Sequence, residues 1–171
     1  DSGKYNLTNI NKSYTSEEFV KYINNLISNQ PIISIEDPFA EDDWSSWQQF
    51  MEIAPAKLQL LGDDLLTTNL QRLDKAIANK SANAILIKPN QNGLVTSTLN
   101  VLKQARANNF NTVVSARSGE NEDSWLADLA TGWSAGQIKV GSTHGSERNA
   151  KWNRLLEFEA TEETRFINPF N

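Results

Sequence analysis

The sequence predicts an α/β fold built on a parallel sheet, and three features of its 171 residues support this prediction. Short apolar runs alternate with longer segments whose apolar residues recur at helical spacing. This strand-then-helix order repeats about five times, which is typical of parallel strands joined by crossover helices. Polar residues follow the apolar runs, as expected where strands end at a ligand-binding face. A complete (β/α)8 barrel needs about 250 residues, so the units form either more than half of a barrel or an open doubly wound sheet.

The first predicted helix spans residues 15–28, "TSEEFVKYINNLIS", after a polar, Asn-rich opening. A Thr-Ser start and two glutamates in the first turn favour a helix N-terminus at this position. The run "PIISIEDP" at 31–38 predicts a buried strand with a functional end at Glu36 and Asp37, because the following proline cannot continue a strand ladder. Residues 41–54 predict a helix with acidic residues at its positive end.

The second unit begins with "KLQLLGDDL" at 57–65, which is strand-like up to Gly62 and Asp63. A helix is expected at 68–80, with Asn69 as its cap. The other three units follow the same pattern. Their strands are expected at 82–90, 112–117 and 137–141, and their helices at 94–109, 121–133 and 146–160. The tail at 161–171 has no clear periodicity.

Composition argues against several classes of protein. The formal net charge is −5, from 16 Lys and Arg against 21 Asp and Glu, with no basic tract, so nucleic acid is not an expected partner. Cysteine is absent, so no disulfide and no thiolate metal site is expected. The apolar runs are far shorter than the ~20 residues needed to cross a bilayer, so no membrane span is expected. No glycine-rich phosphate loop supports a nucleotide-binding interpretation.

The candidate functional residues follow the predicted strands. In chain order they are Glu36, Asp63, Lys88, Arg117 with Ser118, and Lys139. Because the carboxyl ends of parallel strands lie on one face, these residues are expected in one pocket. The two carboxylates suit Mg²⁺, and the last three residues suit an anionic substrate that carries a phosphate and a carboxylate. A nearby metal and a second cation favour the neutral form of a lysine, which makes Lys88 a candidate general base.

Several conspicuous residues have structural interpretations instead. The acidic run at 41–44 is expected to be a solvated helix start, and Trp44 and Trp47 are expected to pack on the helix. Residues 121–123, "NED", are expected to cap the next helix. His144, the single histidine, is expected at the surface in the loop after the last strand, although that loop makes substrate contact possible.

Five segments carry a resemblance to a known family. They are "SIEDPFAEDDW", "LGDDLLTTN", "ILIKPNQNG", "VVSARSGENED" and the last part, "GQIKVGS" followed by "SER" and "KWNRLLEFE". In the same order, from Gly3 to about Glu159, these segments resemble the carboxyl-terminal part of enolase, the phosphopyruvate hydratase family of glycolysis. The resemblance implies that the α/β fold is a partial (β/α)8 TIM-type barrel of the enolase superfamily, with about five strand-helix units.

The resemblance also implies a reaction, the Mg²⁺-dependent, reversible dehydration of 2-phosphoglycerate to phosphoenolpyruvate. Glu36 and Asp63 correspond to two of the three carboxylates that hold the tighter Mg²⁺ ion in the family. Lys88 corresponds to the base that removes the C2 proton. Enolase-superfamily sites are a standard example of a lysine or histidine base acting beside Mg²⁺.

Substrate binding is implied at the other strand ends. Arg117 and Ser118 correspond to residues that bind the substrate phosphate, and Lys139 corresponds to a lysine that contacts the substrate carboxylate. Family members also carry an amino-terminal capping domain and first barrel strands, which supply the general acid and the third metal carboxylate. We therefore expect residues 1–171 to be the carboxyl-terminal part of such a barrel and to be inactive without the remainder.

One position separates this sequence from the family pattern. The family has "SHRSGE" where this sequence has "SARSGE", so Ala116 replaces an active-site histidine. Two alternatives follow: a lyase for a related phosphonate substrate, or a non-catalytic binding or scaffold module with the enolase fold. In every case a cytoplasmic protein is expected, as a homo-oligomer or together with a complementing chain.

Overall fold

The computed structural model describes residues 3–161 and 164–170. Within these ranges, a five-stranded parallel sheet has the strand order β3-β4-β5-β6-β7, which is also the chain order. The strands are β3 (Ser34–Glu36), β4 (Gln59–Gly62), β5 (Ala84–Ile87), β6 (Asn111–Ser115) and β7 (Gly136–Lys139). Each lies inside or within one residue of a segment that the sequence predicts as a strand. The prediction of a parallel sheet is therefore confirmed.

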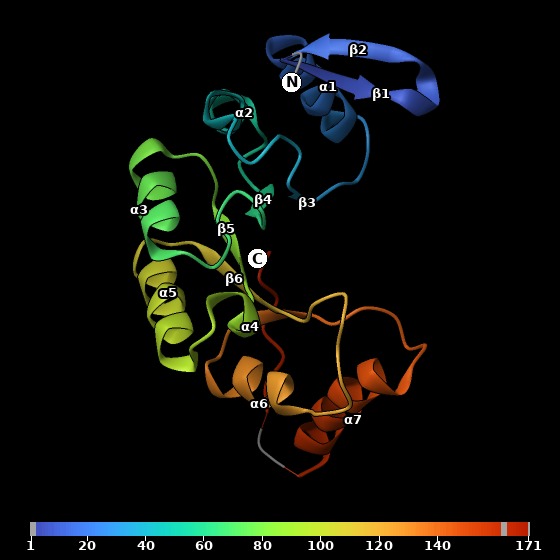
Figure 1. The fold of residues 1–171 in the computed structure, drawn as a ribbon, viewed down its shortest axis with the longest axis vertical. Helices are drawn as coiled ribbons and strands as arrows, with labels where there is room; N and C mark the ends of the chain where they lie inside the picture. The colour runs from blue at the N-terminus through green and yellow to red at the C-terminus, as the bar shows by residue number, and fades with distance from the viewer. Residues whose placement is uncertain (1–2, 162–163, 171) are drawn as a thin grey trace.

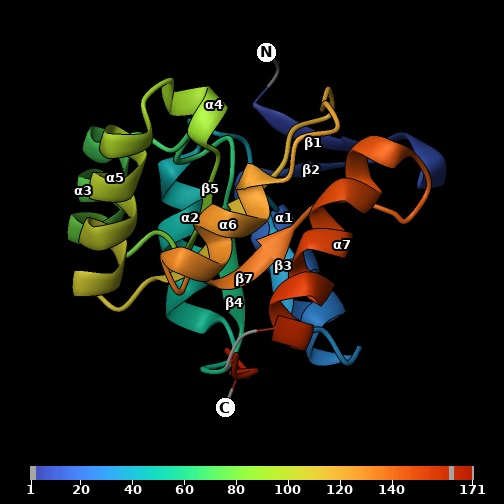
Figure 2. The same cartoon turned by 90° about the horizontal axis from the view of Figure 1, so that it is seen from below.

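The helices predicted from the sequence are present as well. They are α1 (Ser16–Ser28), α2 (Trp44–Ile53), α3 (Leu70–Asn79), α5 (Val95–Ala107), α6 (Trp125–Gly132) and α7 (Ser146–Thr161). Asn69 caps α3 as predicted, because its side chain accepts a hydrogen bond from the backbone N–H of Arg72 at 3.1 Å. Figure 1 shows the strands following an arc, with α2, α3, α5 and α6 along its outer side. In Figure 2, α3 and α5 lie side by side, and α7 lies towards the other end of the arc, where it contacts α6.

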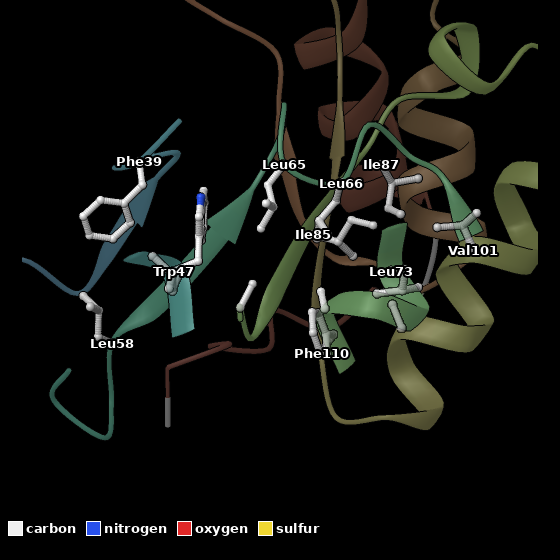
Figure 3. Packing of buried hydrophobic residues seen from close by; sticks show 14 of the residues in the cluster. Phe39, Trp47, Leu58, Leu65, Leu66, Leu73, Ile85, Ile87, Val101 and Phe110 are labelled. Carbon is white, nitrogen blue, oxygen red and sulfur yellow. The ribbon is translucent and has the colours of Figure 1, made fainter. Parts of the chain in front are cut away.

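The main hydrophobic core lies between the sheet and these helices. Ile85 and Ile87 of β5 point outward into it, where Leu73 of α3 and Val101 of α5 pack around them (Figure 3). Trp47 of α2 is fully buried in the same cluster, which confirms its predicted packing role. Burial of a large apolar side chain contributes about 1.5–3 kcal/mol, so this layer holds the helices in place.

The other face of the sheet is concave and arranged in layers. Near the amino ends of the strands, the amides of Gln59 and Gln137 bond each other reciprocally, at 3.1 and 2.8 Å, and Asn111 donates to Gln59 at 3.0 Å. A small apolar cluster follows, made of Leu61, Ala84, Leu86 and Val113. Two strands separate β4 from β7, a distance of about 14 Å in a flat sheet, so the glutamine pair requires strong curvature. The sheet is part of a barrel rather than an open doubly wound sheet.

Three local features differ from the sequence prediction. The Asn-rich opening forms an antiparallel hairpin, β1 (Lys4–Leu7) and β2 (Lys12–Thr15), joined by the 3-10 turn Thr8–Ile10. Its apolar residues are too few for a strand pattern, and left-handed Asn11 ends the turn. A short helix, α4 (Pro89–Asn92), begins where a strand end was expected, because proline suits the first position of a helix.

The predicted helix cap at residues 121–123 is wrong. Helix α6 begins later, with Ser124 as its N-cap residue. Asp123 is instead turned towards Lys151 of α7, with 3.9 Å between the charged groups. In the tail, residues 164–168 form no helix or strand, in agreement with the missing periodicity, and its residues 162, 163 and 171 lie outside the described part of the chain.

The hairpin is attached to the barrel through Asp43, the N-cap residue of α2. Its carboxylate accepts hydrogen bonds from the Tyr5 hydroxyl at 2.7 Å and the Ser16 hydroxyl at 2.9 Å. Ser45 and Ser46 donate to it as well. Burial opposes ionisation of this carboxyl group, but the hydrogen bonds outweigh burial and lower the pKa of Asp43 to about 2. Asp43, at the predicted helix start, therefore both caps α2 and links the hairpin to the barrel.

We predict that Asp43→Ala lowers the free energy of unfolding by about 1–2 kcal/mol at neutral pH, because α2 and the hairpin lose a shared acceptor. A carboxyl whose folded-state pKa lies below its ordinary value of 3.8 stabilises the fold above that value, and the contribution disappears as pH falls towards about 2. Urea unfolding of the natural polypeptide at pH 7, 5 and 3 should therefore show a smaller difference at pH 3. Asp42→Ala, at an exposed neighbouring position, is the control. If the difference in unfolding free energy between the unchanged protein and Asp43→Ala did not depend on pH, the stabilising role of the ionised Asp43 carboxylate would be contradicted.

Candidate functional site

Four of the predicted site residues meet at the carboxyl ends of the strands. Lys88 Nζ lies 2.6 Å from Asp63 Oδ1, and both side chains are nearly buried, at 11% and 12% exposure. Lys139 Nζ lies 2.6 and 2.7 Å from the two oxygens of Glu36, although the two residues are 103 positions apart. These side chains continue the inward-facing layers of the concave sheet. The expected convergence of strand ends is thus present in two carboxylate-lysine pairs.

A cluster of carboxylates forms the acidic part of the site. Glu36, Asp37 and Asp63 each place an oxygen within 4.8 Å of the others, a spacing that would allow one cation to be shared. Oxygen donors of this kind fit a hard divalent ion such as Mg²⁺. Asp37 was noted at the end of its strand but not assigned to the metal site. The signal for including it was its place beside Glu36, directly before a proline.

Asp37 also fixes the backbone beneath the cluster. It adopts a left-handed conformation with φ of 41°, and its carboxylate accepts hydrogen bonds from the N–H groups of Asp63 at 3.0 Å and Asp64 at 2.7 Å. Burial raises the pKa of Asp37, although these two backbone donors oppose the shift. These hydrogen bonds connect the end of β3 to the residues that follow β4. The side chain of Asp63 is directed to Lys88.

The position of Lys88 depends on the preceding loop. Its N–H donates to the Thr68 hydroxyl at 2.9 Å, and the Asn92 side chain donates to the Thr68 carbonyl at 2.9 Å. Thr67 and Thr68 both have positive φ, 48° and 49°, a conformation that is rare for β-branched residues and costs free energy. These threonines could not be predicted as site residues, because a positive φ leaves no pattern in the sequence when the residue is not glycine.

Arg117 and Ser118 lie in the exposed loop after β6, beside the end of β7. The Arg148 guanidinium of α7 donates to the carbonyls of both residues, at 2.8 and 2.9 Å. The Arg117 N–H donates to Glu120 Oε1 at 2.7 Å. The structure therefore brings these two residues to the same face as the carboxylate-lysine pairs. Arg148 and Glu120 bind their main chain, and their side chains lie at the surface.

A cavity of about 500 Å³ opens between the loops that follow β5 and β6. Pro89 and Asn90 line one side, and Ser115, Glu120 and Trp125 line the other. It is bordered by sequence neighbours of Lys88 and Arg117 rather than by those side chains. His144 is exposed in the loop after β7, where its backbone N–H donates to Ser142 Oγ, in agreement with its surface interpretation.

The parallel strand order, the outer helices and the charged residues at the carboxyl ends of curved strands define a protein of the (β/α)8 barrel class. Residues 1–166 match the family model described as "Enolase, C-terminal TIM barrel domain". The enolases of two strains of Ureaplasma parvum serovar 3 are each 53% identical to the chain over 158 residues. The chain belongs to the enolase family.

The matched region is only part of those relatives. The 158 aligned residues make up 92% of this chain and 36% of each Ureaplasma enolase. The chain thus spans about a third of the length of the curated relatives that it matches. Among the residues that the structure describes, no helix is long and apolar enough to span a membrane.

We predict that Glu36→Gln and Asp63→Asn each weaken Mg²⁺ binding by about tenfold or more, because each replaces one charged carboxylate of the cluster with a neutral amide. Titration calorimetry of the natural polypeptide measures the affinity. Asp64→Asn is the matched control, since Asp64 is an exposed acid next to Asp63. An equal loss in the control would place the ion elsewhere.

Proposed function

We propose that the chain is the carboxyl-terminal part of a lyase that performs the Mg²⁺-dependent, reversible dehydration of 2-phosphoglycerate to phosphoenolpyruvate. The observation that carries this proposal is the pairing of Lys88 with Asp63 and of Lys139 with Glu36 at one face of an enolase-family barrel. Those pairs offer metal ligands, a base and a carboxylate-binding cation within one site. A cytoplasmic location in glycolysis belongs to the same proposal.

Glu36 and Asp63 would hold the metal ion, with Asp37 beside them. The carboxylate oxygens within 4.8 Å of one another fit a small divalent cation in charge and donor type. When bound, Mg²⁺ supplies Lewis-acid stabilisation of the negative charge that develops on the substrate carboxylate. Asp63 and Glu36, when they hold such a cation, would pair less tightly with Lys88 and Lys139, which would leave both lysine nitrogens available to the substrate.

The chain's own residues then divide the chemical work. Lys88, as its neutral amine, takes the proton from C2 and becomes an ammonium group, and its backbone is kept in place by Thr68. Lys139 binds the substrate carboxylate and stabilises the charge that grows there as the proton leaves. Arg117 and Ser118 bind the phosphate at the far end, which fixes the substrate relative to Lys88.

The proposal assigns the general acid to residues outside this sequence. The departing 3-hydroxyl needs a proton, and the site residues of this chain have other roles. A longer polypeptide or a complementing chain would provide the acid, the third metal carboxylate and a capping domain. The chain by itself is then inactive.

We predict that Lys88→Ala in the natural polypeptide abolishes exchange of the C2 proton of 2-phosphoglycerate, because the change removes the proposed acceptor of that proton. Exchange into deuterated water, followed by proton NMR, measures this step separately from dehydration. Lys103→Ala, at an exposed lysine of α5, is the control and should exchange normally. Near-normal exchange in Lys88→Ala would remove Lys88 from the role of base.

Ala116 favours two alternative functions. It directly follows β6, its N–H donates to the Lys139 carbonyl at 2.9 Å, and its side chain lies in the main hydrophobic cluster at 9% exposure. Without an imidazole at this position, the site could accept a related phosphonate substrate, or the fold could serve as a non-catalytic scaffold.

We predict that Ala116→His raises kcat/KM for 2-phosphoglycerate about tenfold or more, because it adds a proton donor beside Arg117. Ala116→Leu is the control, since it adds volume at the same packed position without a donor. Both variants lose some stability through overpacking, so their melting temperatures are compared. If the histidine brings no gain and the unchanged protein prefers a phosphonate analogue, the substrate assignment is wrong. Failure to bind Mg²⁺ with a transition-state-like hydroxamate would favour the scaffold.

A further inference from the structure

Lys151 of α7 is a fully buried lysine outside the set of residues assigned to the reaction, with a side-chain exposure of 0%. Its Nζ donates to the Asn121 carbonyl at 2.6 Å and lies 3.2 Å from Glu120 Oε2 and 3.9 Å from Asp123 Oδ1. All three acceptors belong to the loop between β6 and α6. A single ammonium group therefore gathers three positions of one loop.

Packing alone does not require a charge at this position. Removal of an ammonium group from water costs free energy, and apolar residues of similar volume often replace buried ion pairs without loss of stability. An apolar residue on α7 could fill the space, but it could not bind the loop by three polar contacts. The specific contribution of Lys151 is thus the conformation of the loop.

The contacts of Lys151 continue to the main chain of Arg117. Glu120 faces Lys151 with Oε2, and its Oε1 accepts the Arg117 N–H at 2.7 Å. Arg148, one helical turn before Lys151 on α7, donates to the carbonyls of Arg117 and Ser118 and to that of Val140 after β7. Residues at this spacing lie on the same face of a helix. One face of α7 therefore binds both the first part of the loop, at residues 117–118, and its second part, at residues 120–123.

We propose that Lys151 is a positioning residue for the anion-binding loop. It fixes Glu120, and Glu120 fixes the backbone of Arg117, so that Arg117 and Ser118 present their side chains to a phosphate in one geometry. This inference rests on the proposed phosphate-binding role of these two residues. The new element is that the phosphate affinity of Arg117 and Ser118 depends on the buried ammonium group of Lys151 on α7.

The test compares Lys151→Met with the double variant Lys151→Met/Glu120→Gln in the natural polypeptide. Methionine keeps the volume, and glutamine removes the carboxylate that would otherwise remain buried without its partner, while its Oε1 can still accept the Arg117 N–H. Arg154→Met is the matched control, because Arg154 on the same helix pairs with Asp128 of α6 rather than with the loop. The measurements are calorimetry with inorganic phosphate, kcat and KM, thermal unfolding, and amide hydrogen exchange at residues 117–123.

Both Lys151 variants should bind phosphate about tenfold more weakly or worse. KM should rise more than kcat falls, because the proposed base, Lys88, follows β5 and lies outside this loop. Amide exchange at 117–123 should accelerate by about tenfold. The double variant should regain thermal stability without regaining phosphate affinity, and Arg154→Met should retain affinity. If Lys151→Met does not fold, the double variant decides the question.

Normal phosphate affinity and normal exchange in a folded double variant would overturn the inference, because Lys151 would then only fill space. A different result is expected if the proposed function itself is wrong. In that case the unchanged protein neither binds phosphate nor converts 2-phosphoglycerate, whereas exchange at 117–123 still reveals whether Lys151 orders the loop. Unchanged exchange in both Lys151 variants overturns the positioning role whatever the substrate.

Discussion

Curvature of the parallel sheet is the constraint on which the site depends. In a flat sheet the ends of β3 and β7 would be separated by about 19 Å, yet Glu36 and Lys139 meet at 2.6 Å. At the opposite ends of the strands, the reciprocal amides of Gln59 and Gln137 close the same arc. The apolar layer between them is small, so polar contacts across the concave face define much of its shape.

Curvature also explains the order of charges at the strand ends. Glu36 at the end of β3 and Asp63 just after β4 are matched by lysines after β5 and on β7, and each lysine reaches a carboxylate from a different strand end. Removal of a carboxylate would leave a partly buried ammonium group without its partner, which is costly. The same arrangement places the proposed base, the proposed carboxylate-binding cation and the proposed metal ligands around one space. In the proposed reaction, the side chains that stabilise the strand ends are therefore also those that perform the chemistry.

The sequence was sufficient to predict the repeating units, the parallel order and the convergence of Glu36, Asp63, Lys88 and Lys139, because strand periodicity is local and parallel ends share a face. Periodicity alone could not choose between a barrel and an open sheet, since curvature depends on pairs such as Gln59 and Gln137, which are 78 residues apart. The resemblance to enolase made that choice, and the structure confirms the barrel. The hairpin was missed because its strands are short and mostly polar. The contacts that fix the loops, such as those of Thr68 and Arg148, were not predicted because each joins segments that are distant in the sequence.

The agreement between strand order and chain order has a consequence for how the protein folds. Each strand pairs with the strand that precedes it in the chain, so every new unit can dock onto an edge that already exists. Contacts of this kind carry a low loop-closure cost and suit assembly during synthesis, from the amino-terminal side onwards. The pairs that span 78 and 103 residues can form only after the last strand has emerged. The carboxylate-lysine site is then among the last parts of this chain to be assembled.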